Sequence, residues 1–160
     1  MKEKVYIETS VVSYLCSRQS RDLIVAANQE VTQEWWRDER RRYDLFVSEF
    51  VLSEIAAGDK DAALKRQEAI QGIAILIVNE ASERLAVEIM RQAKLPGSVA
   101  DDVAHVSVAS VQGMEYLLTW NCAHIANPHW LGKLSRIITA CGYSMPAVCT
   151  PQALLEGKRS

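Results

Sequence analysis

Four oxygen-bearing side chains stand at the edges of apolar segments, where their chemistry could be shared. They are Glu8, Glu54, Asp102 and Asn121. Glu8 directly follows the apolar run 5–7, and Asn121 directly follows the run 116–120. An open parallel sheet places its ligand crevice outside the carboxyl ends of its strands. Carboxylates gathered in one crevice repel each other unless a cation or a proton lies between them. The pattern therefore indicates a metal site.

The donors of this set are all oxygen atoms, which favours a hard divalent cation such as Mg²⁺. Such ions can activate a water molecule and stabilise the leaving oxygen of a phosphodiester. The four side chains can meet only if the first and fourth strands of the sheet are neighbours. Each also has an ordinary alternative: a strand-ending acid at Glu8, a surface helix residue at Glu54, a first-turn helix acid at Asp102 and a turn residue at Asn121.

Four further polar residues flank this set, and they are Ser10, Asp101, His105 and His124. Ser10 offers its hydroxyl from the turn after the first strand. Asp101 and Asp102 point about 100° apart on a helix, so we expect one of them to face the crevice and the other to flank it. His105 can reach either aspartate, as a partner that orients a carboxylate or as a general base. His124 could touch a substrate phosphate or pack against the site, and both alternatives stay open.

The elements that must position these residues alternate between strands and helices. Strands are expected at 5–7, 45–47, 73–78, 116–119 and 147–149, and helices at 9–17, 21–42, 50–58, 59–70, 81–93, 99–112, 128–141 and 151–155. The unbroken apolar run 73–78 predicts a strand buried on both faces. Thr9 or Ser10 is expected to cap the first helix, and Ser98 the helix 99–112. This alternation predicts an α/β sandwich with a mostly parallel sheet.

Length and charge narrow the class of protein. The chain has 160 residues and a net charge of -2, which suits one domain over 1–160 and does not support sequence-independent DNA binding. The best basic cluster, 37–42, alternates in sign and predicts a solvated helix face. No apolar run could cross a bilayer, and the start of the chain is no signal peptide. We expect a cytoplasmic protein without a membrane partner.

Cysteine and tryptophan add two smaller expectations. The four cysteines show no C-x-x-C pairing, so neither a disulfide framework nor a closed zinc site is expected. A cluster of Cys122 with His124 and His129 is the alternative to half-buried thiols and a surface imidazole. Trp35 and Trp36 are adjacent, so only one can point straight inward, and an exposed one would mark an interface.

Four short segments, in register along almost the whole chain, resemble the motifs of PIN-domain ribonucleases. Segment 6–11 resembles the opening Asp-Thr/Ser-Asn/Ser motif, and 51–54 resembles the second acidic motif on the helix after strand two. Segment 100–106 resembles the third motif, with Asp102 in its acidic position, and 117–121 resembles the fourth, often Thr-x-Asp. Glu8 and Asn121 depart from the usual Asp at their positions. Glu is one methylene longer, and Asn is neutral and lowers the charge of the site.

The resemblance implies a three-layer α/β/α fold around a central parallel sheet and Mg²⁺- or Mn²⁺-dependent cleavage of RNA. It also suggests the VapC-like toxins, which dimerise and are held inactive by a partner antitoxin. On this hypothesis Glu8, Glu54 and Asp102 hold the metal, and Asn121 adds a ligand or positions water. The alternative is a catalytically weak protein of the same fold that acts by binding RNA or another protein.

Overall fold

A computed structural model describes residues 1–156 of the chain. Five strands form one sheet in the order β3-β2-β1-β4-β5, and every neighbouring pair is parallel. The strands are β1 (Glu3–Ile7), β2 (Tyr43–Ser48), β3 (Ala74–Leu76), β4 (Tyr116–Leu118) and β5 (Ala147–Cys149). Val5 of β1 lies opposite Leu45 of β2 on one side and Tyr116 of β4 on the other. The first and fourth strands are therefore neighbours, as the prediction of a shared site requires.

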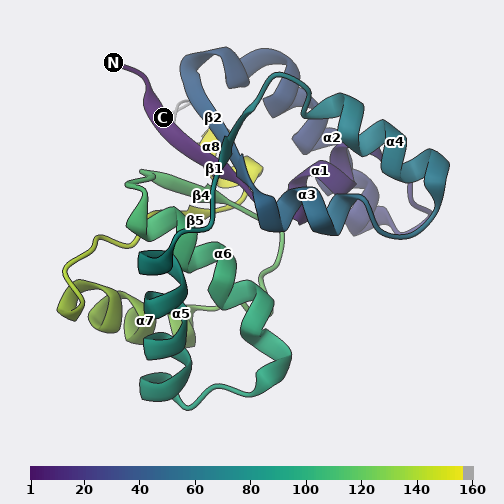
Figure 1. Ribbon diagram of the computed structural model, residues 1–160. Coiled ribbons are helices and arrows are strands. Elements are labelled where there is room, and N and C mark those ends of the chain that lie inside the picture. Colours follow the sequence, from purple (N-terminus) through teal and green to yellow (C-terminus); the bar gives the residue numbers. More distant parts are fainter. Residues whose placement is uncertain (157–160) are drawn as a thin grey trace.

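Helices cover both faces of the sheet, which confirms the predicted α/β/α sandwich (Figure 1). The connections that join β1 to β2 and β2 to β3 contain α1 (Thr9–Cys16), α2 (Leu23–Glu34), α3 (Glu49–Ile55) and α4 (Lys60–Ala69). The later connections contain α5 (Glu80–Ala93), α6 (Ala100–Val111) and α7 (Pro128–Ala140), and α8 (Pro151–Glu156) follows β5. The chain extends the sheet first to one side of β1 and then to the other. The gap between β1 and β4 is consequently the topological switch point, where open α/β sheets bind ligands.

The core is centred on β1, whose residues Val5, Tyr6 and Ile7 are fully buried. The prediction that 73–78 is buried on both faces is wrong. β3 forms the edge of the sheet, and the side chains of Ile75 and Ile77 are 49% and 67% exposed. An apolar run of this length cannot by itself distinguish an edge strand from a central one.

The predicted helix 21–42 ends early. α2 stops at Glu34 and is followed by a π-helical turn, Trp35–Glu39, and a 3-10 turn, Arg40–Arg42. The wider turn lets the ring of Trp35 enter the core, where it is fully buried and stacks on Tyr43 at 5.8 Å between centroids. Trp36 is partly buried. Neither tryptophan is therefore exposed, and the expected sign of an interface is missing at both.

Two local predictions also change. Ser98 lies in a 3-10 turn, Gly97–Val99, and gives no side-chain cap to α6. The first helix is capped by Glu8, whose carboxylate accepts the N–H of Ser10. Within residues 1–156, no helix is both long and apolar enough to span a bilayer.

Candidate active site

Glu8 is a buried carboxylate at the carboxyl end of β1, and only 6% of it is exposed. Its Oε2 accepts the Ser10 N–H at 3.1 Å, and its Oε1 accepts the Thr119 hydroxyl at 2.6 Å. The Ser10 hydroxyl also donates to Oε1, and it accepts the N–H of Trp120 at 2.8 Å. Hydroxyls from the ends of both central strands therefore fix this carboxylate in one orientation.

Asp102 lies in the first turn of α6 and is partly buried. Its Oδ1 accepts the side-chain amide of Asn121 at 3.1 Å. Its Oδ2 lies 3.1 Å from Nδ1 of His124, whose ring stacks on Trp130 at 5.5 Å between centroids. The Asn121 side chain in turn accepts the backbone N–H of His124 at 3.2 Å. The turn after β4 thus holds Asp102 from two sides.

The Glu8 and Asp102 clusters meet through the backbone after β4. The N–H of Asn121 donates to the Thr119 hydroxyl at 3.0 Å, so Thr119 contacts Glu8 while Asn121 contacts Asp102. Partial burial raises the pKa of Asp102 above its ordinary value, and the charge of Glu8 raises it further against the opposing effect of His124. Among the described residues, 1–156, no lysine or arginine acts on this aspartate. Within that part of the chain, only histidines offset the negative charge of Asp102.

Glu54 belongs to a second polar cluster, on the other side of the turn after β1. Its Oε1 is bonded by Nε2 of His105 and accepts the Thr9 hydroxyl at 3.2 Å. His105 is 1% exposed, and its Nδ1 lies 2.6 Å from the hydroxyl of the buried Tyr6. His105 therefore orients Glu54 and not Asp101 or Asp102, although it stands on their helix.

The hydrogen bonds around His105 run in one direction. The N–H of Val51 donates to Ser48 Oγ at 3.4 Å, and the Ser48 hydroxyl lies 2.7 Å from the Tyr6 hydroxyl. An ionised Glu54 can only accept, and a backbone N–H can only donate. Every hydrogen finds an acceptor when Ser48 donates to Tyr6, Tyr6 to Nδ1 of His105, and Nε2–H of His105 to Glu54. The network thus assigns a neutral His105 that carries its proton on Nε2.

Burial and the hydrogen bonds of this network shift the pKa of Glu54 in opposite directions. Partial burial raises the pKa of Glu54, but the interactions with His105 and the Thr9 hydroxyl outweigh it and leave the pKa below its ordinary value. Burial raises the pKa of Tyr6 far above its usual range, so its hydroxyl stays protonated as a donor.

Asp101 is exposed, and neither Asn121 nor His124 bonds it as they bond Asp102. Together with Phe50, Ser53 and Glu54 it lines an open pocket of about 150 Å³. One aspartate of the adjacent pair thus faces the switch point and the other flanks it, as expected for neighbours on a helix.

The donor chemistry at the switch point suits a hard cation, since Glu8, Asp102 and Asn121 offer only oxygen ligands. Mg²⁺ takes one or two carboxylates from a protein and completes its shell with water and substrate phosphates. Within residues 1–156, however, no group of three or more His, Cys, Asp or Glu side chains could hold a metal, and this includes the alternative cluster at Cys122. The two carboxylates therefore form no closed protein cage, and a cation between them would need further ligands from outside the protein.

Sequence reasoning missed Thr119, Tyr6 and Ser48. Thr119 follows β4 by one residue and is fully buried, and a polar residue ending an apolar run was the available signal. Ser48 offered the same signal, because it follows the apolar run 45–47, whereas Tyr6 gave none because it lies inside an apolar strand. Cys149 at the end of β5 offers no competing chemistry: burial raises the pKa of its thiol to about 11, which leaves it unreactive near neutrality.

The chain resembles known proteins in structure but not in sequence. No protein-family profile matches the chain, and no curated protein sequence matches it. VapC20 from Mycobacterium tuberculosis, a Sarcin-Ricin loop cleaving toxin, superposes with a TM-score of 0.57 at 16% identity over 87% of this chain and 95% of its own. VapBC2 from Rickettsia felis, solved with a DNA fragment from its promoter, gives 0.54 at 13% identity over 92% and 98%. At such identities these likenesses establish a shared fold.

Proposed function

Since the chain has the fold of VapC-like PIN domains, we propose that it is a metal-dependent endoribonuclease that hydrolyses RNA phosphodiester bonds. One observation carries the proposal: hydrogen bonds through Thr119 and Asn121 link Glu8 to Asp102 at the switch point of a parallel sheet, and no lysine or arginine within residues 1–156 pairs with Asp102. Two like charges held together in this way favour a cation between them.

Glu8 and Asp102 would hold Mg²⁺ or Mn²⁺, with Asn121 and Glu54 flanking them as further oxygen ligands. When bound, the cation supplies positive charge to the phosphodiester and lowers the pKa of water. The chain's own contribution is rigidity. Ser10 and Thr119 fix the carboxylate of Glu8, His124 and Asn121 fix that of Asp102, and His105 fixes Glu54. Such preorganisation spares the site any rearrangement when substrate arrives.

The partners follow from the proposed function. RNA is the substrate, and we propose a toxin-antitoxin pair in which a cognate antitoxin protein holds the chain inactive in the cytoplasm. The fold shared with the two toxin structures supports this role. A homodimer is proposed from the resemblance of the motifs to VapC-like toxins.

A second candidate is a catalytically weak protein of this fold that acts by binding RNA or protein. It is favoured by the hydrogen bonds that already occupy all four carboxylate oxygens of Glu8 and Asp102. The neutral amide of Asn121, where Asp is frequent among PIN domains, points the same way. Calorimetry separates the two candidates, because Mn²⁺ binding that Glu8→Gln abolishes would count against the second.

The direct test is RNA cleavage in Mn²⁺ by purified wild type and two matched variants. Asp102→Asn should lower the rate by about 10²-fold or more, the scale expected for a positioned catalytic group. Asp101→Asn changes the same chemistry at an exposed neighbour and should keep most of the activity. Cleavage that survives Asp102→Ala unchanged would rule out the assignment.

A further inference from the structure

A groove of about 360 Å³ lies at the amino ends of β2 and β3. Its lining includes Arg40, Arg41, Asp44, Phe46, Gly72 and Ala74. Glu8 and Thr119 follow the carboxyl ends of their strands, so the groove opens at the opposite edge of the same sheet. It is therefore separate from the candidate active site.

Two arginines of the charged run 37–42 form no ion pair with any residue that the structure describes. Arg37 bonds Asp38 at 2.9 Å, and Arg42 lies 3.3 Å from Glu39. Both acids of the run are thus engaged by these two arginines. The other two arginines, at positions 40 and 41, both line the groove.

Arg40 is partly buried, and its guanidinium lies 4.3 Å from the ring centroid of Trp36. A cation–π contact of this kind fixes the planar group in place. Burial lowers the pKa of Arg40, and the charge of Arg41 lowers it further, so the two cations repel each other. Asp44 also lines the groove, but no ion pair within residues 1–156 joins it to either arginine. The balance of charge in the groove is therefore positive.

We propose that this groove binds a phosphate of single-stranded RNA outside the catalytic centre, with Arg40 and Arg41 as donors. A guanidinium donates two parallel hydrogen bonds to phosphate oxygens, which makes arginine the preferred phosphate ligand. Phe46 forms an apolar aromatic wall beside them, of the kind on which bases stack. The choice of RNA rests on the proposed ribonuclease function, whereas the choice of a phosphate rests on the groove itself.

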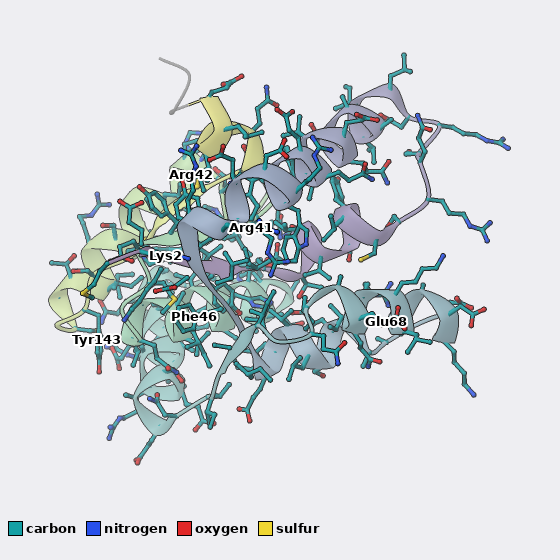
Figure 2. The ribbon with its side chains drawn as sticks, turned by 90° about the horizontal axis from the view of Figure 1, so that it is seen from above. Lys2, Arg41, Arg42, Phe46, Glu68 and Tyr143 are labelled. Atoms are coloured by element: carbon teal, nitrogen blue, oxygen red, sulfur yellow. The ribbon has the colours of Figure 1, made fainter. Side chains whose placement is uncertain are left out.

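One further cation lies near the groove. Figure 2 shows Lys2 on the same part of the molecule as Arg41 and Phe46. Lys2 immediately precedes Glu3, which is paired with Tyr43 at the start of β2. A strand of RNA that leaves the groove would thus meet Lys2 at the amino end of β1, whereas Glu39 offsets the charge of Arg42.

Fluorescence anisotropy with the full chain tests the groove. The probe is a 2′-O-methylated single-stranded RNA in EDTA, which binds without being cleaved. Arg40→Gln and Arg41→Gln should each weaken binding and reduce the slope of log affinity against log salt by about 0.7, the value for one phosphate contact on a single strand. Arg37→Gln removes the same charge from an exposed arginine outside the groove and should leave both quantities unchanged.

Arg41 is exposed, so its variant tests the groove even if Arg40→Gln perturbs the stack on Trp36. Equal RNA affinity in Arg41→Gln and Arg37→Gln would overturn the proposal. Adenosine monophosphate is the second probe. If adenosine monophosphate displaces RNA from the wild type but not from Arg41→Gln, the result would support the site. If the nucleotide binds without displacing RNA, the groove would belong to free nucleotides and the proposal would be wrong. Because binding is measured without metal or cleavage, failure of the ribonuclease proposal would leave this result intact.

Discussion

The Thr119 hydroxyl donates a 2.6 Å hydrogen bond to Glu8 Oε1 and so links the carboxyl ends of the two central strands. Thr119 is fully buried, and its oxygen also accepts the N–H of Asn121 at 3.0 Å. One hydroxyl therefore sets both the orientation of a buried carboxylate and the start of the turn that reaches Asp102. The candidate site depends on this residue as much as on its acids.

Replacing Thr119 by valine tests this dependence at nearly constant shape. Glu8 loses a donor and the Asn121 N–H loses its acceptor, both in the protein interior. We expect the free energy of unfolding, measured in urea, to fall by about 1–3 kcal/mol, the cost of buried polar groups left unpaired. Thr139→Val, at an exposed position of α7, is the control and should change stability much less. An equal loss in the two variants would contradict the proposed link.

Glu8 and Asp102 should be coupled electrostatically even without metal. Burial raises the pKa of Asp102, and the charge of Glu8 adds to that rise. Glu8→Gln removes the charge at constant size, so the pKa of Asp102 should fall. Carbon-13 NMR of the Asp102 carboxyl across an acid titration measures the shift directly. Glu68→Gln, at an exposed position of α4, should leave the Asp102 titration as in the wild type, and a rise in Glu8→Gln would refute the coupling.

Glu54 should stabilise the fold in a pH-dependent way. Its folded pKa lies below the ordinary value of 4.5, because His105 and Thr9 outweigh the effect of partial burial. The stabilisation is therefore complete above pH 4.5 and is lost as the pH falls through the lower folded pKa. The Glu54→Gln variant lacks the stabilisation that an ionised Glu54 provides. The difference in the free energy of unfolding between wild type and variant should therefore shrink in acid. Urea titrations at a series of pH values measure this difference, and one that grows in acid would reverse the sign of the argument.

Much of the site could be predicted because it follows from local rules. Glu8 and Asn121 each end an apolar run, which places them at the carboxyl ends of strands in any parallel sheet. Asp101 and Asp102 stand in a first helical turn, where only one of two neighbours can face inward. These inferences need no knowledge of strand order.

The remainder could not be predicted because it depends on packing between distant elements. The bond between His105 and Glu54 requires α3 and α6 to approach each other, and no spacing in the chain encodes that. The edge position of β3 is likewise set by strand order. The apolar run 73–78 does not encode that order, so the burial predicted from it was wrong. The π-helical turn at Trp35 arises from the fit of one ring into the core.

Tyr6→Phe should break the buried network at its centre. The change removes one oxygen, and it leaves the Ser48 O–H without an acceptor and Nδ1 of His105 without a donor, both in the interior. We expect a loss of about 1–3 kcal/mol in the free energy of unfolding. Nitrogen-15 NMR of His105 should report the second consequence: Nε2 keeps its proton, because the carboxylate of Glu54 still accepts it, and the Nδ1 resonance shifts because that nitrogen loses the hydrogen bond from Tyr6.

The matched control is Tyr14→Phe, which removes a hydroxyl from a partly buried tyrosine stacked on Trp120 at 5.7 Å between centroids. It should keep both the wild-type stability and the His105 nitrogen shifts, because the ring stack needs no oxygen. The Nδ1 shift is the decisive measurement, since a general weakening of the core would lower stability in either variant without removing the hydrogen bond to Nδ1. An unchanged Nδ1 shift in Tyr6→Phe would show that Tyr6 does not donate to His105, and the directional network through Ser48 and Tyr6 would then be wrong.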